Sequence, residues 1–125
     1  MNRIEAALTA LALAIAGTTA AQAGSPAADR ALQEYEEALK LEPNVDHGRE
    51  LFRKCTICHL PEGWGTESGS YPQIAGQLNT VIIKQLADIR ARNRDVPTMY
   101  PFSDRSTVGN AQDIADIAAY ISALP

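Results

Sequence analysis

Cys55-Thr56-Ile57-Cys58-His59 is the most informative run of residues in the sequence. Two cysteines separated by two residues, with a histidine directly after the second, form the pattern for covalent haem attachment. Each thiol can add across one haem vinyl group, and the adjacent imidazole can reach the iron from one face. One helical turn places both sulfurs along the same porphyrin edge. The motif therefore predicts a protein built around one haem c.

The same two cysteines are also compatible with a disulfide or with a thioredoxin-like redox pair. A Cys55–Cys58 disulfide would close a loop too small to stabilise the chain much. A redox pair of the thioredoxin type sits beside a βαβ pattern, and the sequence shows no such pattern. Covalent haem is therefore the preferred interpretation.

Residues 1–23 have the features of a cleaved export signal. Arg3 lies in a short polar start, residues 6–16 are apolar or small but for one threonine, and Ala21-Gln22-Ala23 forms an A-x-A cleavage pattern. The apolar run is shorter than the ~20 residues that span a bilayer, and no second long apolar run follows. We therefore expect cleavage before Gly24, export to the periplasm and no transmembrane segment in the mature form.

The composition favours one small acidic domain. Residues 24–125 suffice for a single domain, and the net charge of −4, made more negative by two haem propionates, argues against a nucleic-acid partner. Aromatic residues make up only 6% of the chain, so a haem would supply apolar bulk that the side chains lack. We expect a monomer.

Capping residues and hydrophobic periodicity predict helices before the motif. Ser25 and Pro26 open a helix that runs to about Leu41 and has an acidic outer face. Together with the residues around it, this helix is an extension over residues 24–44. Asp46 is expected to cap a second helix that leads into the Cys55 turn.

Loops and helices alternate after the motif. Residues 60–76, rich in Gly and Pro, predict a loop that covers one face of the haem. Residues 78–92 predict a helix with an Asp88–Arg92 pair on its surface. Residues 93–109 predict an extended loop. A last helix is predicted to start at Asn110, with Asp113 in its capping box. With no convincing strand, residues 45–125 are expected to form an all-α domain wrapped around one cofactor.

The sixth position of a haem iron determines its chemistry. Met99, 40 residues after His59 in a proline-bounded loop, is the preferred second axial ligand because a thioether is a soft ligand suited to iron. His47 is an alternative ligand, but eight residues of helix would carry it ~12 Å along the axis from Cys55. An open position, filled by water or a gas, is the third possibility.

At this point the chain resembles the class I cytochromes c, and within them the bacterial c4/c5-like group. The resemblance covers about residues 46–124. It rests on the attachment motif early in the chain, on Tyr71-Pro72-Gln73-Ile74-Ala75-Gly76-Gln77, on Gln85-Leu86, and on the closing run of residues 113–121. The order and spacing of these fragments imply the small cytochrome c fold, preceded here by an additional N-terminal helix.

The resemblance also implies roles for individual residues. The Pro72 carbonyl would accept a hydrogen bond from the free N–H of His59 and so fix the ring. A close helix crossing is implied for four structural residues, which are Gly48 and Phe52 on one helix and Ala119 and Tyr120 on the last.

At three further positions the resemblance leaves an alternative open or the sequence departs from the family pattern. Arg94 lies where the family often has a basic residue near a haem propionate, although a solvated arginine is an equal alternative. Trp64 is expected to pack against the porphyrin edge, with a docking surface as the alternative. Leu60 follows the motif where glycine is usual in this group.

These observations together predict a periplasmic electron carrier, not an enzyme. It would pass one electron between larger redox proteins, with His59 and Met99 bound throughout and with small, transient partner contacts. Electrons would leave through the exposed thioether edge near Cys55 and Cys58. The alternatives are a fixed subunit of a dehydrogenase complex, anchored by the acidic N-terminal helix, and a haem peroxidase or gas sensor in which Met99 dissociates.

Overall fold

The computed structural model describes residues 24–125, so the expected export signal lies outside the described residues. All regular structure in this part of the chain is helical, which confirms the predicted all-α class. The elements are α1 (Pro26–Leu39), α2 (Val45–Phe52), α3 (Thr56–His59), α4 (Asn79–Arg90), the 3₁₀ helix η1 (Pro97–Met99), α5 (Tyr100–Ser103) and α6 (Ala111–Ser122). None of these helices is long and apolar enough to cross a membrane.

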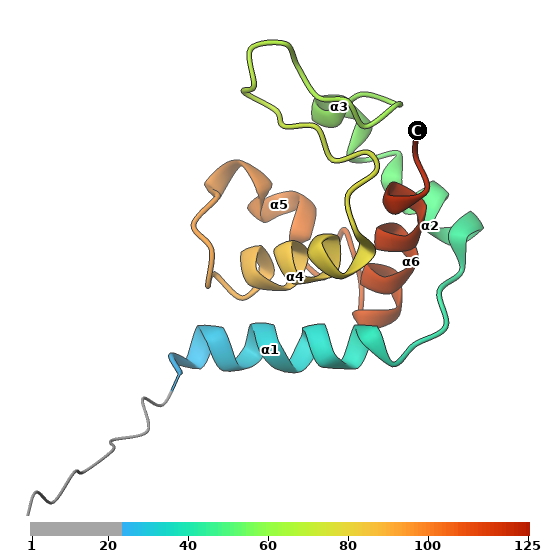
Figure 1. The fold of residues 1–125 in the computed structure, drawn as a ribbon. Coiled ribbons are helices and arrows are strands. Elements are labelled where there is room, and N and C mark those ends of the chain that lie inside the picture. Colours follow the sequence, from blue (N-terminus) through green and yellow to red (C-terminus); the bar gives the residue numbers. More distant parts are fainter. Residues whose placement is uncertain (1–23) are drawn as a thin grey trace, which may run out of the picture.

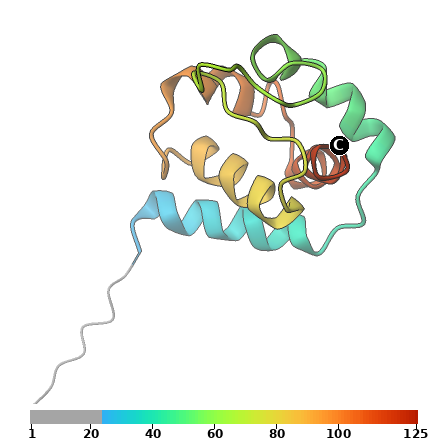
Figure 2. The ribbon, with the colours of Figure 1, turned by 45° about the horizontal axis from the view of Figure 1, so that its top comes forward.

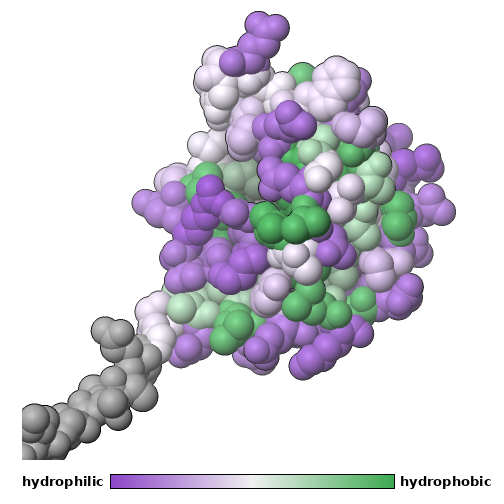
Figure 3. Space-filling view, viewed as in Figure 1, coloured by the Kyte–Doolittle hydropathy of each residue, from purple (hydrophilic) through white to green (hydrophobic). Residues whose placement is uncertain are grey.

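The helices pack around α6, which contacts α1, α2 and α4. Helix α1 lies along α4 at one end of the molecule, whereas α3 and the loop after it lie at the other end (Figure 1). Figure 2 shows the same arrangement after a turn, with the loop of residues 60–76 passing over the α3 end. The buried cluster is built mainly from Phe52 and from apolar residues of α4 and α6, with Val108 beside them. On the face seen in Figure 3, hydrophobic side chains form small patches separated by hydrophilic ones.

Helix starts follow the capping rule, with one difference from the sequence prediction. The Ser25 hydroxyl accepts a hydrogen bond from the Ala28 N–H, as predicted for α1. The cap of α2 is Asn44 rather than Asp46, because the Asn44 side chain accepts from the His47 N–H and the helix already begins at Val45. Asparagine and aspartate are equally good caps, so the spacing of candidates alone could not decide between them.

The segment predicted as an extended loop contains two short helices, η1 and α5. Pro97 and Pro101 stand in the first turn of each, where proline is tolerated because its missing N–H has no helical partner. The sequence predicts both prolines in an extended loop around Met99, but here they start helices. The predicted Asp88–Arg92 pair is also wrong: Asp88 pairs with Lys84, and Arg92 reaches Asp104 at 3.2 Å.

Helices α2 and α6 approach each other closely at Gly48. A Cβ at this position would lie 2.0 Å from the Asp116 carbonyl oxygen, so only glycine allows the crossing. Phe52 and Tyr120 are in contact across the same two helices, with ring centroids 5.3 Å apart and ring planes tilted by 53°. The resemblance implied that Gly48 and Phe52 meet Ala119 and Tyr120; Phe52 does contact Tyr120, whereas the backbone nearest Gly48 is that of Asp116, one turn nearer the start of α6.

Candidate cofactor site

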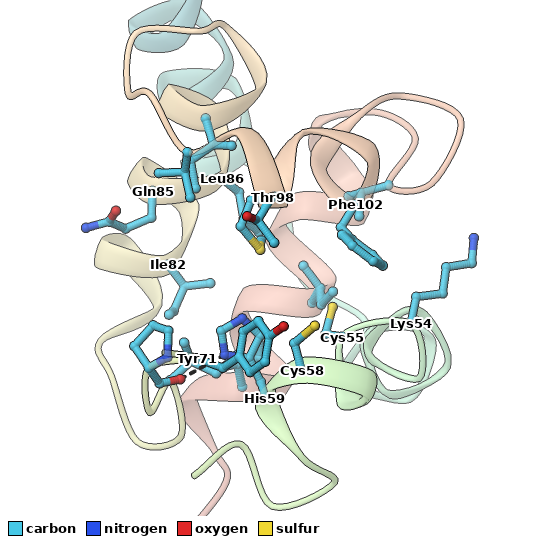
Figure 4. A pocket seen from close by; sticks show the side chains of 18 of the residues that line it. Lys54, Cys55, Cys58, His59, Tyr71, Ile82, Gln85, Leu86, Thr98 and Phe102 are labelled. Carbon is cyan, nitrogen blue, oxygen red and sulfur yellow. Dashed lines mark hydrogen bonds between the residues drawn. The ribbon is translucent and has the colours of Figure 1, made fainter. Parts of the chain in front are cut away.

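A cavity of about 520 Å³ opens between α3, α4 and the η1–α5 segment. A volume of this size is in the range of cofactor pockets in proteins. Its lining is mainly apolar, and α4, α5 and α6 contribute Ile82, Leu86, Phe102, Ile117 and Ile121 to it. Figure 4 shows Cys55, Cys58 and His59 on one side of this space, with Leu86 and Thr98 across from them.

The attachment motif forms one helical turn at the edge of the cavity. The N–H groups of Cys58 and His59 both donate to the Cys55 carbonyl, at 3.2 and 2.9 Å. Both cysteine side chains point toward the cavity (Figure 4), whereas Ile57 between them is 75% exposed. Within this one turn the two thiols therefore face the cavity, whereas the Ile57 side chain between them faces solvent.

His59 is held in one orientation by its hydrogen bond to Pro72. Its Nδ1 lies 2.8 Å from the Pro72 carbonyl oxygen, which can only accept, so Nδ1 carries the proton. This bond is the dashed line in Figure 4. The residue is only 6% exposed, and the tautomer leaves Nε2 with a free lone pair for a metal.

The loop of residues 60–76 is folded back on itself and so presents the Pro72 carbonyl. The Gly65 N–H donates to the His59 carbonyl at 3.0 Å, and the Thr66 N–H donates to that of Tyr71 at 2.9 Å. A Cβ on Gly65 would lie 2.2 Å from the Tyr71 carbonyl oxygen. The glycine therefore permits the close approach that places Pro72 beside the histidine.

The predicted second ligand lies in the lining of the same cavity. Met99 ends η1 and lines the same cavity as His59, and Arg94 also lines it. Phe102, on α5, is also part of this lining and was missed in the sequence. Its spacing of three residues from Met99 has meaning only in a helix, and the sequence predicted a loop there, so the residue could not be singled out.

The structure does not bring Trp64 into the cavity. Its side chain is 57% exposed, and its indole N–H donates to the Pro125 carbonyl at 3.2 Å. The glycine-rich loop carries the residue away from the lining, toward the end of α6. The geometry therefore does not support the predicted packing of Trp64 against a cofactor.

His47 belongs to a different part of the molecule. Its Nδ1 lies 2.8 Å from the buried Asp116 carboxylate, and the group also approaches Asp113. This hydrogen bond raises the pKa of His47 above its usual value. Burial raises the pKa of Asp116, but hydrogen bonds from the Asn44 N–H, His47 and Gln112 outweigh burial and lower it. His47 is therefore part of an ion pair between α2 and α6 and does not line the cavity.

The residues around the cavity fit a covalently attached haem better than a redox dithiol. Cys55 and Cys58 are not joined in a disulfide, and burial, with the charge of Cys58 as a second cause, raises the pKa of the Cys55 thiol to about 11. Dithiol oxidoreductases instead need a thiolate with a lowered pKa. The buried Gln85 Oε1, also in the lining, has no hydrogen-bond partner among the described residues, as expected where a bound group supplies the missing contact.

Comparisons with known proteins agree with this assignment. The family model described as "Cytochrome c" matches residues 45–125. The chain is 37% identical to "Cytochrome c4" of Azotobacter vinelandii over 91 residues, which is 64% of this chain and 43% of that protein. It is 34% identical to "Cytochrome c4" of Stutzerimonas stutzeri over 113 residues, 88% of this chain and 52% of that protein. The chain thus spans about half the length of the curated relatives it matches.

Proposed function

We propose that this chain, which belongs to the class I c-type cytochromes and is similar to cytochrome c4, carries single electrons between larger redox proteins. The haem c that it binds through Cys55 and Cys58 supplies a one-electron couple between Fe(II) and Fe(III). The observation that supports the proposal is that His59 of α3 and Met99 of η1, which are 40 positions apart in the sequence, line the same cavity.

The side chains of the cavity have distinct roles in this proposal. His59 is the first axial ligand through Nε2, and its bond to Pro72 fixes the ring and raises its basicity. Met99 is the second ligand, and its thioether favours the reduced state and raises the potential. Because both ligands stay bound in both oxidation states, little reorganisation accompanies transfer and no position remains for a substrate.

The surroundings of the cavity determine how electrons enter and leave. Cys55 and Cys58 are half-buried and the residue between them, Ile57, is exposed, so the edge that carries the cysteines is the proposed exit for electrons. Arg94, which lines the cavity but is otherwise exposed, is proposed to lie near a propionate. Its positive charge would favour the ferrous state, so Arg94→Gln should lower the potential.

Location and partners follow from residues 1–23 and from the general behaviour of carriers. We propose that the protein is exported to the periplasm, acts as a monomer and meets its electron donor and acceptor in short-lived encounters. Interfaces of this kind are small, typically under about 1,200 Å². On the face seen in Figure 3 the hydrophobic patches are small and separated, which suits transient contacts better than a permanent assembly there.

Substitution of Met99 tests the proposal directly. Met99→Ala is expected to keep the haem attached through both cysteines, to abolish the methionine–iron charge-transfer band of the oxidised protein, and to lower the potential. Thr98→Ala is the matched control, because Thr98 precedes Met99 and lines the same cavity but contains no sulfur that could bind iron. An unchanged band in Met99→Ala would show that another group is the ligand. Ready binding of peroxide or carbon monoxide by the wild type would instead indicate an enzyme or sensor.

A further inference from the structure

We infer that Glu34, on the N-terminal helix α1, is a positioning residue for the segment that carries Met99, and that it acts through Arg90. The inference rests on the proposed role of Met99 as an axial ligand. It also assigns a role to α1, which lies outside the stretch matched by the family model.

The inward face of α1 contains a charged residue among small ones. Ala31, Glu34 and Ala38 are its buried residues, and they face the domain because α1 packs on α4 and α6. The side chains of Glu34 and Arg90 are each only 8% exposed and form an ion pair. The acidic helix is therefore docked on its own domain through a buried charge, which argues against a role as an anchor for another protein.

Arg90 connects Glu34 to both ends of the turn between α5 and α6. Its Nε donates to the Ser103 carbonyl at 2.7 Å, its Nη1 donates to Glu34 and to the Gly109 carbonyl, and its Nη2 donates to the Val108 carbonyl. Ser103 is the last residue of α5, and residues 108–109 lead into α6. One guanidinium thus holds both the start and the end of the turn that follows α5.

Removing the carboxylate would leave this buried guanidinium without its ion-pair partner, with only the charge of Asp104 still favouring it, and would also release the exposed Arg105 from Glu34. Burial lowers the pKa of Arg90, and Glu34 opposes that effect through its charge and its hydrogen bond. A buried charge that loses its partner is strongly unfavourable, so Arg90 would turn toward solvent. The carbonyls of Ser103 and Val108 would then lose their donor.

Displacement at Ser103 is transmitted to Met99 through a continuous short helix. Tyr100 directly follows Met99, and its carbonyl accepts from the Ser103 hydroxyl and from the Asp104 N–H. The Arg92 guanidinium lies 3.5 Å from the centroid of the Tyr100 ring, and the Tyr100 hydroxyl donates to Asp95 at 2.6 Å. These contacts fix the start of α5, whereas Arg90 fixes its end.

The test uses the full-length holoprotein and measures how easily imidazole displaces Met99 from ferric iron. In this exchange an iron–sulfur bond is replaced by an iron–nitrogen bond and no electron is transferred. Glu34→Gln, which keeps the shape and removes the charge, is expected to tighten apparent imidazole binding about tenfold, because a charge-assisted contact that keeps Met99 in place is lost. In a Met99→Ala background the same substitution is expected to have no effect, since no sulfur then competes.

Ala31→Gly is the matched control. It lies on the same buried face, one turn before Glu34, and lowers unfolding stability through helix propensity and packing. We expect it to leave imidazole binding unchanged. Arg90→Lys, which keeps a cation but loses the fork of donors, is a second variant that should behave like Glu34→Gln. If Glu34→Gln and Arg90→Lys bind imidazole as Ala31→Gly does, the inference is wrong.

Amide hydrogen exchange separates a failure of this inference from a failure of the proposed ligation. The N–H groups of Met99 and Asp104 donate to the carbonyls of Val96 and Tyr100, and both are expected to exchange faster in Glu34→Gln but not in Ala31→Gly. Wild-type protein without a methionine band would refute the ligation alone. Unchanged exchange at Met99 and Asp104 would refute the positioning role, whatever the iron ligand is.

Discussion

The crossing of α2 and α6 at Gly48 gives a quantitative test of the fold. A Cβ at this position would lie 2.0 Å from the Asp116 carbonyl oxygen and 3.1 Å from the Ile117 amide nitrogen. Both neighbours are helix backbone, so the two helices would have to separate by roughly 1.4 Å to restore an ordinary contact. Overpacking a core costs about 1–3 kcal/mol and occasionally more. We expect Gly48→Ala to lower the free energy of unfolding by about 3 kcal/mol, although alanine is the better helix former.

Guanidinium unfolding of the holoprotein, followed by far-ultraviolet circular dichroism, measures this loss. Gly69→Ala is the control, because a Cβ there would meet nothing within 4 Å and only its φ of +74° opposes the substitution. That strain is worth about 1–2 kcal/mol. If Gly48→Ala loses no more stability than Gly69→Ala, the close approach of α2 and α6 does not limit the fold and the reasoning is wrong.

Three further substitutions probe individual contacts. His47→Gln should destabilise the protein more at about pH 5.5 than above about pH 8, measured as unfolding free energy against pH. The raised pKa of His47 gives a stabilisation that is present below its unfolded value and lost as pH rises through the folded value. Gly65→Ala should displace the Pro72 carbonyl oxygen, which would lie 2.7 Å from the new Cβ. We expect the free energy of unfolding to fall by about 3 kcal/mol and the potential, measured in a redox titration, to fall as well. Leu60→Gly should raise the unfolding midpoint, because Leu60 has a φ of 64° and such strain costs about 1–3 kcal/mol. An unchanged or lower midpoint would contradict this account.

Features determined by neighbouring residues could be predicted from the sequence. The turn from Cys55 to His59 and the cap at Ser25 depend on contacts three or four residues apart. The hydrogen bond between His59 and Pro72 spans 13 residues, and its expectation came from the family resemblance rather than from the spacing. The exact cap of α2 was missed because Asn44 and Asp46 are chemically equivalent candidates.

Features that depend on distant contacts could not be predicted. Glu34 and Arg90 are 56 positions apart, and each has the appearance of a surface residue when only its own helix is considered. Trp64 was expected beside the cofactor because it is a large residue in the loop that was expected to cover one haem face, but that loop carries it to the end of α6. The helices around Met99 were missed because a proline indicates either the end or the start of a helix, and only the fold distinguishes the two.

The isoleucines at positions 82, 117 and 121 belong to the buried cluster and also line the cavity. The interior of the molecule is therefore fully packed only when the cofactor is in place. Attachment of haem thus also determines how well the chain resists degradation. A chain that fails to acquire haem keeps apolar surface around an open space and spends more time unfolded, in the state that proteases degrade. We expect the cellular amount of the protein to follow the supply of haem. Without haem the side chains that enclose it lose their packing contacts, so the chain unfolds more often and is degraded.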